Sequence, residues 1–232
     1  MIKIEGWIGT TLIDFPGKVA AEVFVGGCNF RCPFCHNSSL VFHKYPVISM
    51  DEIKQRIEER RDFIDGVVIS GGEPTMYGYE LIEFVEYLKS LNLLVKIDTN
   101  GSFSKIISKL IKDKLVDFIS MDIKSSRNKY GIAVNLRNVN IAEIDKTINL
   151  IKNSDVEYEF RTTVVPGIVD KEDISDIGEW IKGASLYVLQ QFKPQNLIDK
   201  SFFYITPYPL SFLEELKEMV KPKVKEVKIR NQ

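Results

Sequence analysis

The sequence predicts an α/β protein in which parallel strands alternate with helices to form a partial (β/α)6 barrel, open on one side. Two observations lead to this prediction. Short apolar stretches rich in Val, Ile and Phe alternate along the chain with stretches of helical period. Six such units fit into 232 residues, whereas a closed barrel has eight units in about 250 residues. A doubly wound open sheet is the alternative architecture.

Each predicted strand is a short apolar run, as expected where both faces of a parallel sheet are buried. In chain order the runs are Ala20–Val25, Val67–Ser70, Leu94–Asp98, Phe118–Asp122, Tyr158–Val165 and Leu186–Phe192. Right-handed crossovers between them would curl the sheet towards a barrel. Ahead of them Pro16 and Gly17 mark a turn, so an extra strand is predicted within residues 2–13.

Each predicted helix gathers its apolar residues on one face, which would cover the sheet. In Tyr79–Leu91, the residues Leu81, Phe84, Val85 and Leu88 recur at helical spacing. The other helical stretches are Asp51–Phe63, Phe103–Lys112, Ile141–Lys152 and Glu172–Lys182.

No repeat or linker divides the chain, so we expect a single domain over residues 1–232. It would consist of an N-terminal strand extension (1–19), the barrel core (20–194) and a C-terminal segment (195–232). The 31 basic residues nearly balance the 32 acidic ones, so charge gives no reason to expect nucleic acid or a membrane as partner. No apolar run reaches the ~18 residues of a membrane span. The start lacks a secretory signal pattern, and three cysteines are no disulfide framework, so a cytoplasmic location is expected.

Polar and glycine-rich motifs follow the predicted strands, where parallel α/β folds place their chemistry. The first is Cys28, and the others are SGGEP (70–74), DTNG (98–101), MDIK (121–124), RTTVVPG (161–167) and QQFKP (190–194). Together these motifs predict one functional face at the carboxyl ends of the strands.

All three cysteines lie within eight residues, with the spacing Cys28-x3-Cys32-x2-Cys35. Buried structural thiols have no reason to cluster in this way. Zinc normally takes four ligands in separate pairs, and only the adjacent His36 could supply a fourth. A dithiol redox pair at Cys32 and Cys35 leaves Cys28 unexplained. Three thiolates suit a four-iron cluster, which usually takes four, and would leave one iron open for a substrate or cofactor.

The cysteine motif, with Phe34 before its last cysteine, resembles the signature of radical S-adenosylmethionine (SAM) enzymes. The motifs DFPG, CNFRCPFCHN, SGGEP, DTNG, DIK and VVPG recur in this order in the glycyl-radical-enzyme activating enzymes. These include the activators of pyruvate formate-lyase and of anaerobic ribonucleotide reductase. The likeness spans roughly Trp7 to Pro194 and is closest to the short anaerobic ribonucleoside-triphosphate reductase activating proteins. It implies a partial (β/α)6 TIM-like barrel, open on one side.

The resemblance implies a [4Fe-4S] cluster on Cys28, Cys32 and Cys35 whose open iron binds SAM. Reductive cleavage of SAM would give a 5′-deoxyadenosyl radical, which takes a hydrogen atom from a glycine of a glycyl-radical enzyme. Anaerobic ribonucleotide reductase is a candidate for that partner, and flavodoxin or ferredoxin for the electron donor.

The resemblance also implies a SAM pocket. Its predicted members are Phe34, Gly71, Gly72, Glu73, Pro74, Asp98, Asp122, Lys124, Arg161 and Val165. A monovalent cation is expected at Asp98, Thr99 and Asp122. From the residues alone, an ordinary strand-to-helix turn at the glycines, structural ion pairs and core packing at Phe34 are the alternatives.

One departure from the pyruvate formate-lyase activator lies at the sixth strand. A histidine that contacts the cofactor there is replaced by the stretch Gln190–Lys193, in which Gln191 and Lys193 are candidate substitutes. Two other functions stay open at this stage. They are a radical SAM enzyme that acts on a small molecule or peptide, and a non-catalytic iron–sulfur protein for electron transfer or sensing.

Overall fold

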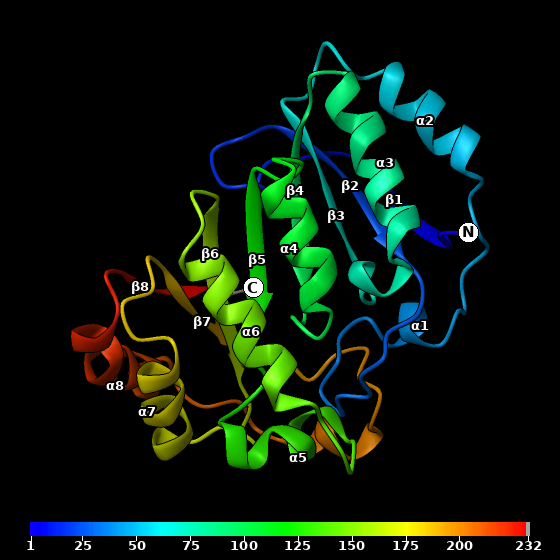
Figure 1. Cartoon of the computed structure of the whole chain (residues 1–232). Helices are drawn as coiled ribbons and strands as arrows, with labels where there is room; N and C mark the ends of the chain where they lie inside the picture. Colours follow the sequence, from blue (N-terminus) through cyan, green and yellow to red (C-terminus); the bar gives the residue numbers. More distant parts are fainter. Residues whose placement is uncertain (231–232) are drawn as a thin grey trace.

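The computed structural model describes residues 1–230 and contains one eight-stranded sheet, with helices along its outer face (Figure 1). The strands lie side by side in chain order. They are β1 Ile4–Thr11, β2 Ala20–Val25, β3 Gly66–Gly71, β4 Leu94–Thr99, β5 Phe118–Asp122, β6 Glu157–Val164, β7 Tyr187–Gln191 and β8 Val227–Arg230. Residues 231–232, the end of the predicted C-terminal segment, lie outside the described residues.

The sheet confirms the predicted α/β architecture, because it curls without closing. Each strand from β2 to β7 pairs in parallel with the next, and β1 pairs antiparallel with β2 as the predicted extra strand. The strand order runs from β1 to β8 without a pair between these two ends. β8 is a parallel strand beyond the six predicted ones, so the sheet continues into the segment after residue 194.

Five helices correspond to the predicted stretches. The helices are α1 Ser38–Val41, α2 Met50–Glu58, α3 Tyr79–Ser90, α4 Ser104–Lys112, α5 Tyr130–Val134, α6 Ile141–Lys152, α7 Lys171–Trp180 and α8 Leu210–Val220. Four of the five match to within two residues, whereas α2 ends at Glu58, five residues before the predicted end at Phe63. The unpredicted ones are α1, α5 and α8. No helix among residues 1–230 combines the length and the apolar character needed to cross a membrane.

The larger core lies between the outer face of the sheet and the helices that cover it, and a smaller apolar cluster lies inside the barrel at its amino-terminal end. The smaller cluster contains Phe15, Ala20, Val68 and Phe118. Ala20 and Phe118 begin their strands, so the cluster closes the amino-terminal end of the barrel. The Lys96 ammonium lies 6.0 Å from the centre of the Phe118 ring. From there towards the carboxyl ends of the strands, polar side chains line the interior.

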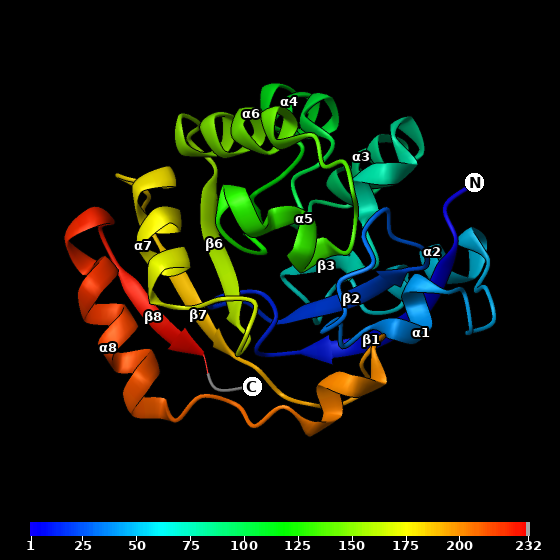
Figure 2. The ribbon, with the colours of Figure 1, turned by 90° about the horizontal axis from the view of Figure 1, so that it is seen from below.

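The other end of the barrel, at the carboxyl ends of the parallel strands, carries α1, α5 and the chain between β7 and α8 (Figure 2). That chain passes from the end of β7 towards the cysteine loop before it returns to α8. The amide of Asp199 donates a 3.0 Å hydrogen bond to the carbonyl of Pro33, which ties the two segments together.

Candidate functional site

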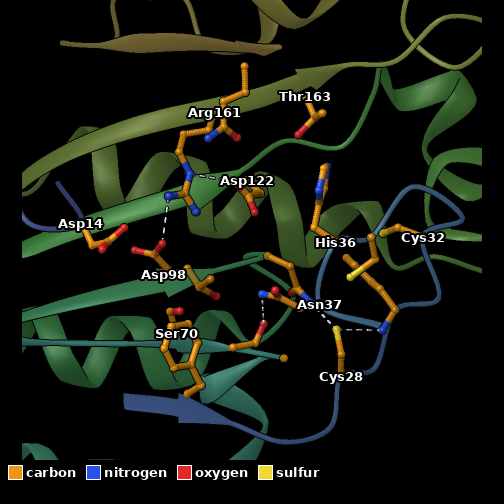
Figure 3. Close-up of a pocket in the computed structure, with 18 of the residues that line it drawn as sticks. Asp14, Cys28, Cys32, His36, Asn37, Ser70, Asp98, Asp122, Arg161 and Thr163 are labelled. Atoms are coloured by element: carbon orange, nitrogen blue, oxygen red, sulfur yellow. Dashed lines mark hydrogen bonds and ion pairs between the residues drawn. The ribbon is translucent and has the colours of Figure 1, made fainter. Parts of the chain in front are cut away.

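A cavity of about 850 Å³ lies inside the barrel and reaches the carboxyl ends of the strands. Three of its lining residues are Cys28, Cys32 and Cys35 from the loop after β2. Asp98, Asp122 and Arg161 line it from β4, β5 and β6 (Figure 3), and Lys124 lines it from the chain just after β5. The strand-end motifs that the sequence analysis assigns to one functional face therefore meet in one cavity.

The cysteine loop is held by close backbone contact with the glycines that end β3. Gly72 donates to the Val25 carbonyl at 2.8 Å, and Glu73 donates to the Gly27 carbonyl at 2.9 Å. A Cβ atom on Gly72 would lie 1.7 Å from the Gly27 carbonyl oxygen, so only glycine fits there. Gly71 has φ of 111°, which also favours glycine. These glycines position the cysteine loop as well as lining the cavity.

The three thiols fit the role of cluster ligands. Burial raises the pKa of Cys28 to about 11 and that of Cys32 to about 12, and it also raises the pKa of Cys35. The Lys124 ammonium opposes the shift at each of the three thiols without cancelling it. Thiols with raised pKa values need a nearby positive charge to ionise. Because the irons of an iron–sulfur cluster supply that charge and stabilise thiolates, three such thiols on one cavity suit a cluster.

Arg161 joins the carboxylates of two neighbouring strands. Its Nε donates to Asp122 Oδ1 at 2.8 Å, and its Nη1 donates to Asp98 Oδ2 at 2.8 Å. Lys124 donates to the other oxygen of Asp122 at 2.9 Å, and Lys96 donates to Asp98 Oδ1. These five side chains therefore form one continuous ion-pair network across β4, β5 and β6.

This network is charged at neutral pH. Burial disfavours the ionised carboxyl of Asp122, but Arg161 and Lys124 outweigh it and hold the pKa of Asp122 well below its usual range. For Lys124, burial is likewise outweighed by Asp122, and the pKa is raised. The ammonium of Lys124 lies close enough to the cysteines to affect their ionisation, so it can bind a carboxylate placed next to a cluster.

Glu73 lies outside the cavity lining, although the sequence analysis places it in the SAM pocket. Its carboxyl is fully buried and accepts hydrogen bonds from the Thr75 amide at 3.0 Å, the Thr99 hydroxyl at 2.8 Å and the Asn100 amide at 2.6 Å. The Thr75 hydroxyl also donates to it. Glu73 thus ties the loop after β3 to the loop after β4.

The remaining predicted site residues divide between the cavity and the core. Phe34, Gly71, Gly72 and Thr99 line the cavity, whereas Pro74 and Val165 are buried outside its lining. Pro74 begins a 3-10 turn over Pro74–Tyr77, and Val165 follows directly after β6.

The stretch that replaces the family histidine also divides. Gln190 lines the cavity, but the two candidate substitutes do not. Gln191 donates instead to the Tyr208 carbonyl at 3.0 Å. His36 lines the cavity with its ring 6.4 Å from that of Phe192.

The cavity also holds charged residues that are not among the predicted site residues. They are Asp14, Glu22, Lys96, Glu159 and Arg230. Lys96 and Glu159 each stand two residues before a predicted site residue in the same strand, at Asp98 and Arg161. Because alternate residues of a strand share a face, the predicted positions of Asp98 and Arg161 in the pocket indicate that Lys96 and Glu159 face the same cavity.

Comparisons with known proteins agree with this geometry. The family description "Radical SAM superfamily" matches residues 23–181. A protein of Methanocaldococcus jannaschii named "Putative glycyl-radical enzyme activating enzyme" is 37% identical over 98% of this chain and 95% of its own length. The pyruvate formate-lyase 1-activating enzyme of Escherichia coli K12 is 25% identical over 78% of this chain and 75% of that enzyme.

Among solved structures, Streptococcus suis SuiB has a TM-score of 0.65 at 16% identity. The match covers 89% of this chain and 47% of SuiB. At that identity the likeness concerns the fold alone.

Proposed function

Because the chain belongs to the radical SAM superfamily, we propose that it is an enzyme that generates a glycyl radical on a partner protein. Its homology to glycyl-radical enzyme activating enzymes extends over nearly the whole chain. That likeness carries the proposal, and the cavity with three cysteines beside a charged network supports it.

The [4Fe-4S] cluster and SAM, which the family implies, would supply reductive cleavage to a 5′-deoxyadenosyl radical that takes a hydrogen atom from the substrate. Cys28, Cys32 and Cys35 would hold the cluster, and Gly71 and Gly72 leave room for a ligand to approach the backbone beside it.

The charged network would orient SAM. Lys124, beside the thiols, would bind the SAM carboxylate. Arg161 would hold Asp98 and Asp122 in place, where their carboxylates could accept hydrogen bonds from the polar groups of SAM. Phe34 would flank the adenine from the cysteine loop. Val165 lies outside the cavity lining, so its predicted place in the SAM pocket would require movement of its segment.

The monovalent cation at Asp98, Thr99 and Asp122 stays a prediction. Each oxygen of both carboxylates already accepts from Arg161, Lys96 or Lys124. A cation would therefore have to displace an ammonium group or share an oxygen with one.

The partner would be a glycyl-radical enzyme, with anaerobic ribonucleotide reductase as the candidate, and the electron would come from a flavodoxin or ferredoxin. A protein substrate agrees with the open barrel, whose end strands β1 and β8 are unpaired with each other and leave a side for a peptide loop to enter. Three free thiols suit a reducing compartment, so we also propose a cytoplasmic location.

The test is isotope transfer from the target glycine. The anaerobic protein is mixed with reductant, SAM and a glycyl-radical enzyme of the same organism that carries deuterated glycine. We expect deuterium in 5′-deoxyadenosine and a persistent organic radical with a glycyl doublet. If each such enzyme stays radical-free while label from a small metabolite enters 5′-deoxyadenosine, the enzyme acts on a small molecule instead. If SAM is never cleaved although the cluster is present, the non-catalytic alternative stands.

A further inference from the structure

A buried carboxyl group in the cavity has no role in the chemistry described so far. Glu22 lies in the middle of β2, three residues before the strand ends at Val25. At ~3.3 Å per residue it therefore starts about 10 Å deeper in the barrel than the loop of cysteines. Its neighbours Asp14 and Ser70 lie on the side of the cavity away from Cys28 and Cys32 (Figure 3). Glu22 thus lines the part of the cavity that lies beyond the proposed SAM site.

Glu22 differs from its buried neighbours in the cavity because it has no cationic partner. Asp98 and Asp122 share Arg161, and Glu159 accepts two hydrogen bonds from Arg230, at 3.1 and 2.9 Å. Glu22 is only 5% exposed, yet among residues 1–230 the only hydrogen bond of its carboxyl group is the one that Oε1 accepts from the Ser70 hydroxyl at 2.8 Å. Within residues 1–230, Oε2 of Glu22 has no hydrogen-bond partner.

The surroundings favour the neutral form of this group. Burial raises the pKa of Glu22 to about 8. The Ser70 hydroxyl and Lys96 oppose the shift, while Asp14 and Asp98 add to it. Lys96 itself is engaged by Asp98, and the charged groups across the cavity, Glu159, Arg161 and Arg230, pair among themselves. At neutral pH the carboxyl is therefore mostly protonated and offers one donor and one acceptor.

We propose that Glu22 binds the main chain of the extended peptide segment that carries the target glycine, an inference that rests on the proposed function. An extended residue presents its N–H and C=O on the same side, so one partner can bond to both. Oε2–H would donate to the carbonyl oxygen. Oε1, with a second lone pair beyond the one Ser70 uses, would accept from the N–H.

The walls around Glu22 suit a peptide backbone. Ile8 faces Glu22 across the β1–β2 pairing, Phe24 is two residues further along the same face, and Ile13 also lines the cavity. Ile8 is 42% exposed and Ile13 is 85% exposed, so a bound peptide would cover apolar surface that is open to solvent without it. A small residue such as glycine fits such a contact because no side chain keeps its backbone away from the wall.

Two variants separate this role from packing. Glu22→Gln keeps a donor and an acceptor in the same shape, whereas Glu22→Met keeps the length and removes both. The probe is a fluorescent peptide centred on the radical-bearing glycine of the partner enzyme, together with the same peptide carrying N-methylglycine. Binding to the anaerobic holoprotein with SAM is measured by anisotropy, so no radical chemistry is involved.

We expect Glu22→Met to weaken binding roughly tenfold, as the loss of one or two hydrogen bonds would, and Glu22→Gln to bind within about twofold of wild type. The N-methyl peptide should bind more weakly than the parent to wild type but equally to Glu22→Met, as a double-mutant cycle requires for a direct contact. Wild-type affinity should fall as pH rises through about 8, because ionised Glu22 has no proton to donate, while that of Glu22→Gln stays level.

Equal binding of the parent peptide to wild type and Glu22→Met, or no binding to wild type, would overturn the inference. If Glu22→Met fails to fold, the pH series of wild type against Glu22→Gln decides, and parallel profiles overturn it. Deuterium transfer from the partner glycine together with these negative results would leave the proposed function standing without this role for Glu22.

Discussion

Replacement of Glu73 by glutamine tests whether this residue acts by holding two site loops together. Its Oε1 accepts from the Thr75 amide and from two threonine hydroxyls, while Oε2 accepts only from the Asn100 amide, at 2.6 Å. The new NH2 group would therefore replace Oε2 and face the N–H of Asn100. That buried donor would lose its acceptor, which costs about 1–3 kcal/mol, and the NH2 group and the N–H of Asn100 would lie donor against donor.

We therefore expect Glu73→Gln to lower the free energy of unfolding by about 2–4 kcal/mol. The measurement is denaturant unfolding of the metal-free protein, followed by circular dichroism. The matched control is Glu83→Gln on the exposed side of α3, which should change stability by less than about 0.5 kcal/mol. Equal stability of the two variants would refute the loop-holding role and return Glu73 to direct cofactor binding.

Three further predictions concern the walls of the cavity. Gly72→Ala should lower stability by about 1–3 kcal/mol and reduce iron uptake, because its Cβ would meet the Gly27 carbonyl oxygen; unchanged melting temperature and iron content would contradict the packing described. Arg161→Ala should leave the iron content intact but weaken SAM cleavage with dithionite, since Asp98 and Asp122 lose their shared partner, while the exposed Arg137→Ala should cleave normally; equal rates would remove Arg161 from the pocket. Folding raises the pKa of Glu22 from 4.5 to about 8, so unfolding between these pH values releases a proton and the folded state loses stability as the pH rises. The stability of wild type should therefore fall relative to that of Glu22→Gln by at most about 1.4 kcal/mol per pH unit in that window. A constant difference from pH 5 to pH 8 would show that Glu22 is ionised in the folded state.

The sequence predicts the strands from β2 to β7 well because each is a short apolar run between turn residues. The cysteine loop and the strand-end motifs could be placed on one face for the same reason, since carboxyl ends of parallel strands meet. The strand β8 was missed because Val227–Arg230 alternates apolar and basic residues at the edge of the sheet. The helix α8 was not predicted either, although it is amphipathic and follows a Pro-rich stretch, because no strand was predicted after it to complete a strand–helix unit.

The polar barrel interior could not be predicted in detail. A parallel strand is expected to be apolar on both faces, so Glu22, Lys96 and Glu159 stand out only when strand alternation is applied to the inner face. The role of Glu73 depends on Thr99 and Asn100, which lie 26 and 27 residues later in the chain. Val165 was assigned by motif likeness, and its burial outside the cavity lining follows from the packing of the segment after β6, which no local pattern reveals.

The iron–sulfur cluster that defines the proposed enzyme is tested by the metal content of the anaerobically reconstituted protein, measured as iron and acid-labile sulfide per chain. With three cysteine ligands on one cavity, we expect about four irons and four sulfides, lost when Cys28, Cys32 or Cys35 is replaced by Ala. After the cluster has been reduced, addition of SAM should also change its electron paramagnetic resonance spectrum. A wild-type protein that holds one zinc ion and no sulfide would contradict the assignment of a four-iron cluster to these cysteines.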